Sequence, residues 1–255
     1  MINFIIFFFI SFVPLAVAET QDADFNLEMS SLMNQTRAYE LRAKSLDRLV
    51  SRYPDKTFPI LTSFITDSSE NASLRYLAAD KLRISSEAQL IFLKILDDPK
   101  QDVLARRIAL AQLVQINKPP LRKKVLEILD RPKEDPAIRQ YALAVFSGWP
   151  EKDKIERLRN FVQSSGEFLN MRTNALFLLE SLGDLDFVRL QVHQFLSDQK
   201  APEELRKNCI VMTERLKDEK FVPLLMRIAG DSHESSSLRQ LAGATLTRMN
   251  RHNIS

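Results

Sequence analysis

LRYLAADKL, residues 74–82, decides the fold, because its pattern returns at regular intervals along the chain. An arginine recurs every 31 to 34 residues and is followed three residues later by a small residue. Seven residues after it comes a large apolar residue, except at Thr213. Recurrence at a fixed spacing is the signature of a repeat architecture. The recurring arginines are Arg42, Arg75, Arg106, Arg139, Arg172, Arg206 and Arg239.

Each arginine segment is predicted to be the second helix of a helix pair. The first helix carries apolar residues at positions i, i+4, i+7 and i+8, as at Ala88, Phe92, Ile95 and Leu96. That spacing is typical of a helix packed on one face, whereas a strand would alternate with a period of two. With only 5 glycines and 45% hydrophobic residues, the sequence predicts an all-α protein of about seven two-helix repeats. We expect one continuous domain over residues 19–249 and a frayed tail over residues 250–255.

An acidic residue stands in the turn between the two helices, eight or nine residues before the arginine. Because the two charges recur in step, we expect the arginines and the turn aspartates to pair as a structural ladder across repeats. The alternative is a row of free cations that grips phosphate, sulfate or an acidic polymer. Ser164 replaces the aspartate in the fifth repeat. The turn aspartates are Asp67, Asp98, Asp130, Asp198 and Asp231.

The helix pair, the turn aspartate and the Arg-x-x-Ala-x-x-x-Leu pattern resemble the HEAT repeat over about residues 36–248. The short repeat is most similar to the phycobilisome-lyase type. This resemblance implies a right-handed α-solenoid, or α/α superhelix of armadillo-like helical type. It also implies that the second helices line a concave face and that Asp and Arg form a ladder. It predicts little about function, because one repeat fold serves many functions.

Residues 1–18 have the features of a secretory signal peptide. An apolar run is broken at Pro14, and Ala16-Val17-Ala18 forms a small-x-small cleavage site, so cleavage is predicted after Ala18. The alternative is an uncleaved anchor, although the run is short for a bilayer span of roughly 20 apolar residues. We therefore expect an exported, periplasmic or secreted protein without a stable membrane span after cleavage.

No pattern of catalytic or metal-binding residues stands out. Cys209 is the single cysteine and occupies the small-residue position of its repeat, so we expect a small buried side chain. His193, His233 and His252 have no metal-ligand spacing, and neither a phosphate-binding loop nor a nucleophile elbow is present. From these observations we expect no catalytic residue, metal or cofactor, and a protein that is not an enzyme.

Two positions on the second helix are candidates for contacts with a partner. The residue after the arginine is mostly polar and includes Tyr76, Arg107 and Lys207. The fifth residue after the arginine is acidic in the first two repeats and apolar later, with Phe177 the largest. An apolar groove around Phe177 would suit a partner helix, and closer packing between repeats is the alternative explanation.

The charge balance favours a protein partner. Thirty-six basic and 33 acidic residues give a net charge of +3, without the strong basic excess of a dedicated nucleic-acid binder. We expect a scaffold or adaptor that binds another protein or a peptide along the concave face. The alternatives are a lyase-like or chaperone activity of HEAT-like proteins and, less favoured, nucleic-acid binding.

Overall fold

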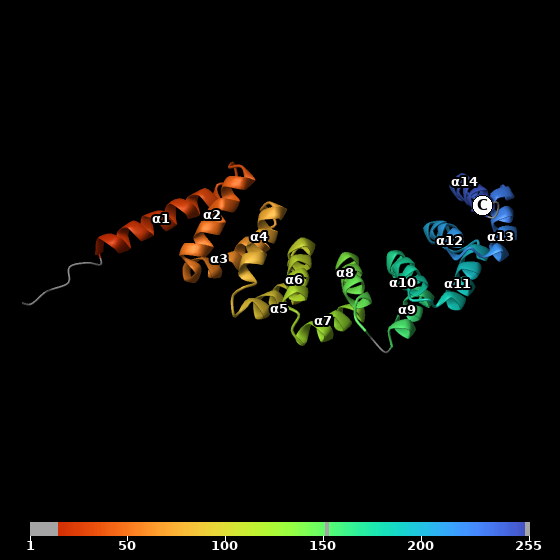
Figure 1. Cartoon of the computed structure of the whole chain (residues 1–255), viewed down its shortest axis with the longest axis horizontal. Coiled ribbons are helices and arrows are strands. Elements are labelled where there is room, and N and C mark those ends of the chain that lie inside the picture. The colour runs from red at the N-terminus through yellow and green to blue at the C-terminus, as the bar shows by residue number, and fades with distance from the viewer. Residues whose placement is uncertain (1–14, 151–152, 253–255) are drawn as a thin grey trace, which may run out of the picture. The chain divides into compact units, whose positions relative to one another are not determined.

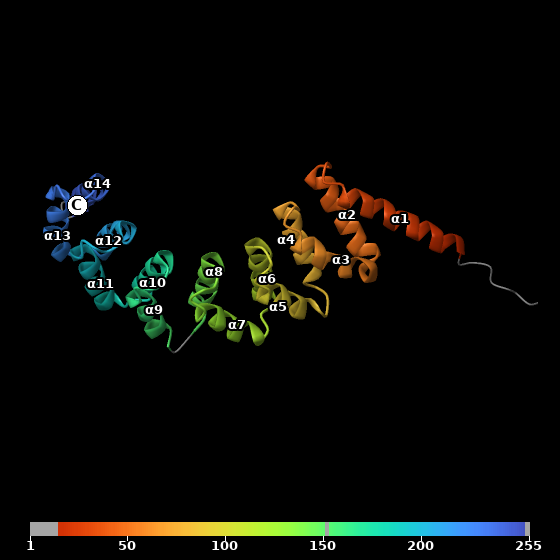
Figure 2. The same cartoon turned by 180° about the vertical axis from the view of Figure 1, so that it is seen from behind.

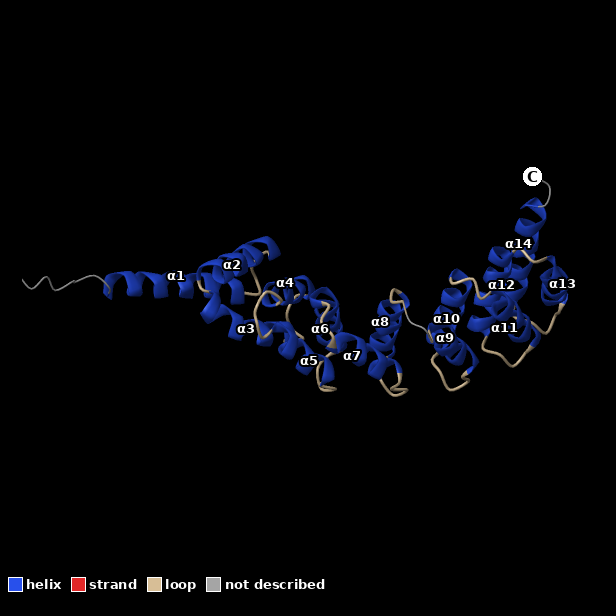
Figure 3. Ribbon diagram, turned by 60° about the horizontal axis from the view of Figure 1, so that its bottom comes forward, coloured by secondary structure: helices blue, strands red, loops and turns tan. Residues whose placement is uncertain are grey.

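The structure is a computed structural model that describes residues 15–150 and 153–252. Most of the expected signal peptide 1–18 and the end of the expected tail 250–255 lie outside the described residues. Over the described ranges the chain forms α-helices joined by short loops, together with one 3-10 helix, η1 (Glu219–Phe221), and contains no β-strand (Figure 3).

The fourteen α-helices of the described residues follow one another as seven successive pairs (Figure 1). The predicted fold class, an all-α protein of two-helix repeats, is therefore confirmed. The pairs are α1 (Leu15–Met33) with α2 (Tyr39–Arg52), α3 (Pro54–Thr66) with α4 (Ala72–Leu82), α5 (Ala88–Asp97) with α6 (Val103–Ile116), α7 (Pro120–Leu129) with α8 (Pro136–Ser147), α9 (Lys154–Gln163) with α10 (Leu169–Ser181), α11 (Leu185–Ser197) with α12 (Glu203–Leu216), and α13 (Val222–Gly230) with α14 (Ser236–His252).

The chain divides into two compact units, Met1–Leu121 and Arg122–Ser255, each described by itself. In the first unit the second helices of the pairs contact one another in order, α2 with α4 and α4 with α6. In the second unit α8 contacts α10, α10 contacts α12, and α12 contacts α14. Both opposite views show α4 beside α6 in the first unit and α10 beside α12 in the second (Figures 1 and 2).

The apolar positions of the repeat form the core of each unit. On α5 the residues Ala88, Phe92, Ile95 and Leu96 are all buried, as the spacing predicted. The position three residues after each arginine is also buried and always small, because adjacent helices approach closely there. Its occupants are Ser45, Ala78, Ala109, Ala142, Ala175, Cys209 and Ala242.

Several boundaries between helices depend on short side chains. Asp102 and Asp135 accept hydrogen bonds from backbone amides of the first turns of α6 and α8, and Asn71 does so for α4. These caps satisfy amides that have no partner within the helix. Gly183 follows α10 with a φ of 83°, a left-handed conformation that glycine adopts at little cost.

Candidate functional site: the arginine ladder and the exposed face of the second helices

The recurring arginines first join the two helices of their own pair. Six of the seven side chains reach the backbone carbonyl ten residues earlier, near the end of the first helix, where carbonyls lack helical partners. Arg239, in the last described repeat, does not: its Nε has no hydrogen-bond partner among the described residues, so the predicted ladder does not extend to it. From Arg75 the Nε donates to the carbonyl oxygen of Ile65 at 2.8 Å. Equivalent bonds join Arg42 to Leu32 at 2.7 Å, Arg106 to Leu96 at 2.9 Å, Arg139 to Leu129 at 2.8 Å, Arg172 to Val162 at 3.0 Å and Arg206 to Leu196 at 3.4 Å.

Most of these arginines also pair with a carboxylate of the following repeat. The Nη2 of Arg75 donates to Asp102 at 2.6 Å. Three further pairs are two-pronged, because both terminal nitrogens of the guanidinium meet both oxygens of a glutamate. These pairs are Arg42 with Glu70, Arg139 with Glu167 and Arg206 with Glu234. We call these carbonyl and carboxylate contacts the arginine ladder.

Burial makes the ladder a structural feature of each unit. The residues Arg42, Arg75, Arg139 and Arg206 are exposed by only 2–3%. The hydrogen bonds that Arg206 donates to Glu234 raise the pKa of Arg206, outweighing the opposing effect of burial. A buried charge of this kind is tolerated only when it is paired and hydrogen-bonded. The ladder therefore holds consecutive repeats in register, and its cations are largely unavailable to an external ligand.

The acidic partners differ from those that the sequence predicted. Asp67, Asp98 and Asp198 end their first helices and accept hydrogen bonds from the backbone amide two residues further on, at 2.9 Å. Asp231 does the same with His233, and Asp130 pairs with Arg157. An aspartate is short and readily closes a turn on its own backbone. The structure thus places these aspartates in the turns and puts a different carboxylate on each paired guanidinium.

The true partners were missed, although the sequence contains a signal for them. Glu70, Glu167 and Glu234 each stand 28 residues after the arginine that they bind and three residues after the first residue of the turn. The turn aspartates recur with the same period, so periodicity alone could not separate the two sets. The longer glutamate side chain can reach the neighbouring repeat, which the aspartate engaged with its own turn does not.

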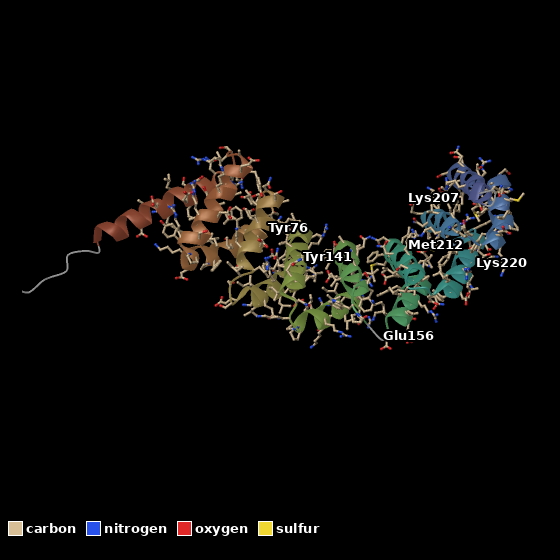
Figure 4. All side chains as sticks on the ribbon, viewed as in Figure 1. Tyr76, Tyr141, Glu156, Lys207, Met212 and Lys220 are labelled. Carbon is tan, nitrogen blue, oxygen red and sulfur yellow. The ribbon has the colours of Figure 1, made fainter. Side chains whose placement is uncertain are left out.

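The residues proposed to contact a partner lie on different second helices. Tyr76 on α4, exposed by 38%, and Lys207 on α12, half-buried, are labelled in Figure 4. Arg107 on α6 is exposed. Lys207 pairs with Glu203 of its own helix at 3.0 Å, and this pair raises the pKa of Lys207. Tyr76 and Arg107 belong to the first unit, and Lys207 belongs to the second.

Phe177 on α10 is half-buried, and its neighbours explain why. The guanidinium carbon of Arg215, on α12, lies 5.6 Å from the centre of the Phe177 ring. Arg215 also pairs with Glu180 of α10 at 2.6 Å. The ring is therefore partly covered by a cation from the next helix, and its remaining surface faces outward.

The fifth position after the arginine changes character along the chain: it is acidic in the first two repeats and apolar from Ala111 of the third repeat onward. In the first unit Asp47 pairs with Lys81 at 2.6 Å and Asp80 pairs with Arg83 at 3.0 Å. In the second unit the same register is apolar, and its side chains are exposed or half-buried. Val211 is exposed by 40%. We call this set the apolar strip; it consists of Ala144 on α8, Phe177 on α10, Val211 on α12 and Ala244 on α14.

A function could also rest on metal ligands, a membrane-spanning helix, a reactive cysteine or a hollow among the described residues. In the residues that the structure describes, no three His, Cys, Asp or Glu side chains are placed to hold a metal ion. None of the described helices has the length and apolar character needed to cross a membrane. Cys209 is fully buried, and burial raises the pKa of its thiol to about 12. A hollow of about 320 Å³ in the first unit is lined by residues that include Phe58, Leu82 and Ile91.

Comparison with known proteins adds a likeness of fold. No family model matches the chain, and no curated protein matches it. The chain is similar to the solved structure of human deoxyhypusine hydroxylase in complex with glycerol, with 17% sequence identity and a TM-score of 0.38. The alignment covers 91% of this chain and 87% of that chain.

This comparison corrects one expectation from the sequence. We expected a protein that is not an enzyme, and the similar structure is that of an enzyme, which contradicts the expectation. At this identity and TM-score the likeness transfers no activity, substrate or site residue to the present chain.

Proposed function

We propose that this chain is an exported scaffold, periplasmic or secreted, that binds a partner protein or peptide segment along its second helices. Export rests on the signal peptide pattern of residues 1–18 with cleavage after Ala18. We also propose that the repeats are HEAT repeats of the short, phycobilisome-lyase type. The period of 31 to 34 residues and the regular arginine support that assignment.

The observation that carries the binding proposal is the apolar strip of the second unit. Its four positions occupy one register on four consecutive second helices, and each of these helices contacts the next. The register is charged in the first two repeats, so an apolar surface is not a requirement of the repeat itself. Extended repeat proteins bind partners along such surfaces, and apolar side chains framed by charges are typical of interfaces.

The charged residues beside the strip indicate what kind of partner fits. Arg215 lies against Phe177 and Glu180, and Arg248 pairs with Glu214 at 2.7 Å. Each pair joins an acid of one helix to a base of the next: Glu180 of α10 to Arg215 of α12, and Glu214 of α12 to Arg248 of α14. An amphipathic helix with an apolar face and charged edges would match both features. A long polyanion would meet acids as often as bases.

Affinity capture with matched variants tests the proposal. The chain from Glu19 is immobilised, exposed to an envelope extract and analysed by mass spectrometry for retained proteins. Phe177→Glu should lose a specific retained protein while its helical circular dichroism persists. Met226→Glu changes an apolar residue on α13, exposed by 62%, and should retain that protein. Equal retention by both variants would rule out binding at the strip.

A further inference from the structure

One rung of the arginine ladder lacks its carboxylate. The third residue after the start of each turn supplies the glutamates of the paired rungs, but in the sixth repeat this residue is Ala201. The backbone there is unchanged. The amide of Ala201 donates to the carbonyl of Asp198 at 3.1 Å, as the amide of Glu234 does to Asp231 at 3.1 Å. From the second repeat onward the occupants of the position are Glu70, Gln101, Glu134, Glu167, Ala201 and Glu234.

The arginine that faces this gap is Arg172. Arg172 keeps the carbonyl contact of the ladder, because its Nε donates to the carbonyl oxygen of Val162 at 3.0 Å. Its guanidinium carbon also lies 5.1 Å from the centre of the Phe195 ring. Within the described chain no carboxylate completes the rung, and Arg172 is half-buried whereas Arg139 and Arg206 are buried. The gap thus leaves a cation accessible from solvent.

The electrostatic state of Arg172 differs accordingly from that of its neighbour in the ladder. Burial without a carboxylate lowers the pKa of Arg172, whereas the Glu234 hydrogen bond raises that of Arg206. A carboxylate that accepts two parallel hydrogen bonds stabilises a charged guanidinium, and Arg139 and Arg206 each have such a partner. Arg172 therefore has the position of a ladder arginine in its own repeat, through its bond to Val162, without the carboxylate that Arg139 and Arg206 have.

The start of α12, which follows Ala201 and Pro202 directly in the chain, contributes a second feature. Pro202 precedes the helix and offers no side-chain cap, unlike Asp135 before α8. Uncapped amides at the beginning of a 14-residue helix favour a negative group. The helix has two acids of its own here, Glu203 and Glu204, but both are paired with Lys207, at 3.0 and 3.7 Å.

We propose that Arg172, in the gap left by Ala201, is a carboxylate-binding site that takes an acidic side chain from a partner segment. The carboxylate would occupy the place that Glu167 and Glu234 fill on their own rungs. The site is separate from the apolar strip, because the inference depends on Arg172 and the turn before α12 and not on Phe177. It goes beyond the proposed function and can hold even if the strip binds nothing.

The first test fills the gap from within. Ala201→Glu in the full chain should place the missing carboxylate on Arg172 and raise the melting temperature by about 2–8 °C, the range for roughly 1–2 kcal/mol in a chain of this size. Ala201→Gln has the same shape without the charge and should produce a smaller rise. A melting temperature for Ala201→Glu that is no higher than that of Ala201→Gln would overturn the proposed geometry.

The second test measures binding directly. The side-chain Nε–H signal of Arg172, assigned with Arg172→Lys, is followed by NMR during titration with a tetraglutamate peptide and, separately, with succinate. Wild type should show a saturable shift with the peptide, and Ala201→Glu should reduce that shift at least tenfold. A shift of equal size in Ala201→Glu, or none in wild type, would refute the site. Saturation by succinate but not by the peptide would refute a partner segment as the source.

Discussion

The guanidinium of Arg139 and the carboxylate of Glu167 form a two-pronged ion pair between α8 and the turn that precedes α10. The side chains are exposed by only 2% and 8%. Arg139 also donates to the carbonyl of Leu129, and Glu167 accepts from the backbone amide of Phe168 at 2.8 Å. The pair therefore ties one repeat to the next and closes the turn at the same time.

Replacing Glu167 with alanine should destabilise the protein strongly. The change leaves the guanidinium of Arg139 buried without a counter-charge, which costs about 3–5 kcal/mol when a buried pair is broken from one side. Urea unfolding followed by circular dichroism measures the loss. Glu180→Ala is the matched control, because it breaks the more exposed pair with Arg215 and should cost at most about 1 kcal/mol. Similar losses for both variants would contradict a special role for the buried rung.

The rung between Arg75 and Asp102 predicts a pH dependence. Burial opposes ionisation of Asp102, but hydrogen bonds from Arg75 and the amide of Ala105 outweigh it and lower the pKa of the carboxyl group. Because the folded pKa is lower than the unfolded one, the stabilisation is present above about pH 4 and is lost as pH falls through the folded value.

Asp102→Asn isolates that charge, since asparagine still caps a helix. At pH 7 the variant should be less stable than wild type by about 1–2 kcal/mol, between the values for exposed and buried charged hydrogen bonds. Denaturant titrations from pH 7 to pH 3 should show the difference shrinking below pH 4. A difference that stays constant with pH would mean that the carboxylate charge contributes nothing.

The regular spacing of small and apolar residues was sufficient to predict the fold, because the packing of the helices requires that spacing. Ala78 and Cys209 are small where helices approach, and Phe92 and Leu96 are apolar where the core lies. The same periodicity was not sufficient to predict which carboxylates pair with the arginines of the ladder. Turn aspartates and ladder glutamates share one period, and only three-dimensional reach distinguishes Asp67, which closes its own turn, from a glutamate such as Glu70, which binds an arginine of the preceding repeat.

The candidate site was less predictable for a related reason. The apolar character of Phe177 was visible in the sequence, but the cover provided by Arg215 was not, because Arg215 belongs to the next repeat. The open rung at Arg172 appears only once the true partners are known. Until then Ala201 looks like an ordinary turn residue.

The end of α10 provides a backbone prediction. Gly183 has a φ of 83°, and the amide of Asp184 donates back to the carbonyl of Leu179 at 3.0 Å. A side chain at Gly183 would meet no neighbouring atom, so the cost of Gly183→Ala comes from the left-handed backbone, about 1–2 kcal/mol. Gly243→Ala on α14 also meets open space but lies within a helix, and it should stabilise by about 0.5–1 kcal/mol. Thermal unfolding of both variants should show shifts of opposite sign; shifts of the same sign would contradict the assignment.

The thiol of Cys209 should be unreactive as long as the protein is folded. Burial raises its pKa to about 12, and the nearby charges of Arg172 and Arg206 only partly oppose this effect. Only the thiolate reacts with alkylating and disulfide reagents, so both access and ionisation are limiting. Labelling with iodoacetamide at pH 8 should be complete in denaturant and negligible in its absence.

The same pKa shift predicts a loss of stability in alkaline solution. The folded pKa of the Cys209 thiol exceeds the unfolded value of about 8.5, so its contribution is complete below that value and declines as pH rises toward 12. Cys209→Ala removes the thiol and keeps the small size that the position requires. Wild type should therefore lose stability more steeply than Cys209→Ala between about pH 8.5 and pH 11. Parallel pH profiles, or rapid labelling of the folded wild-type protein, would show that the thiol is not held in the interior.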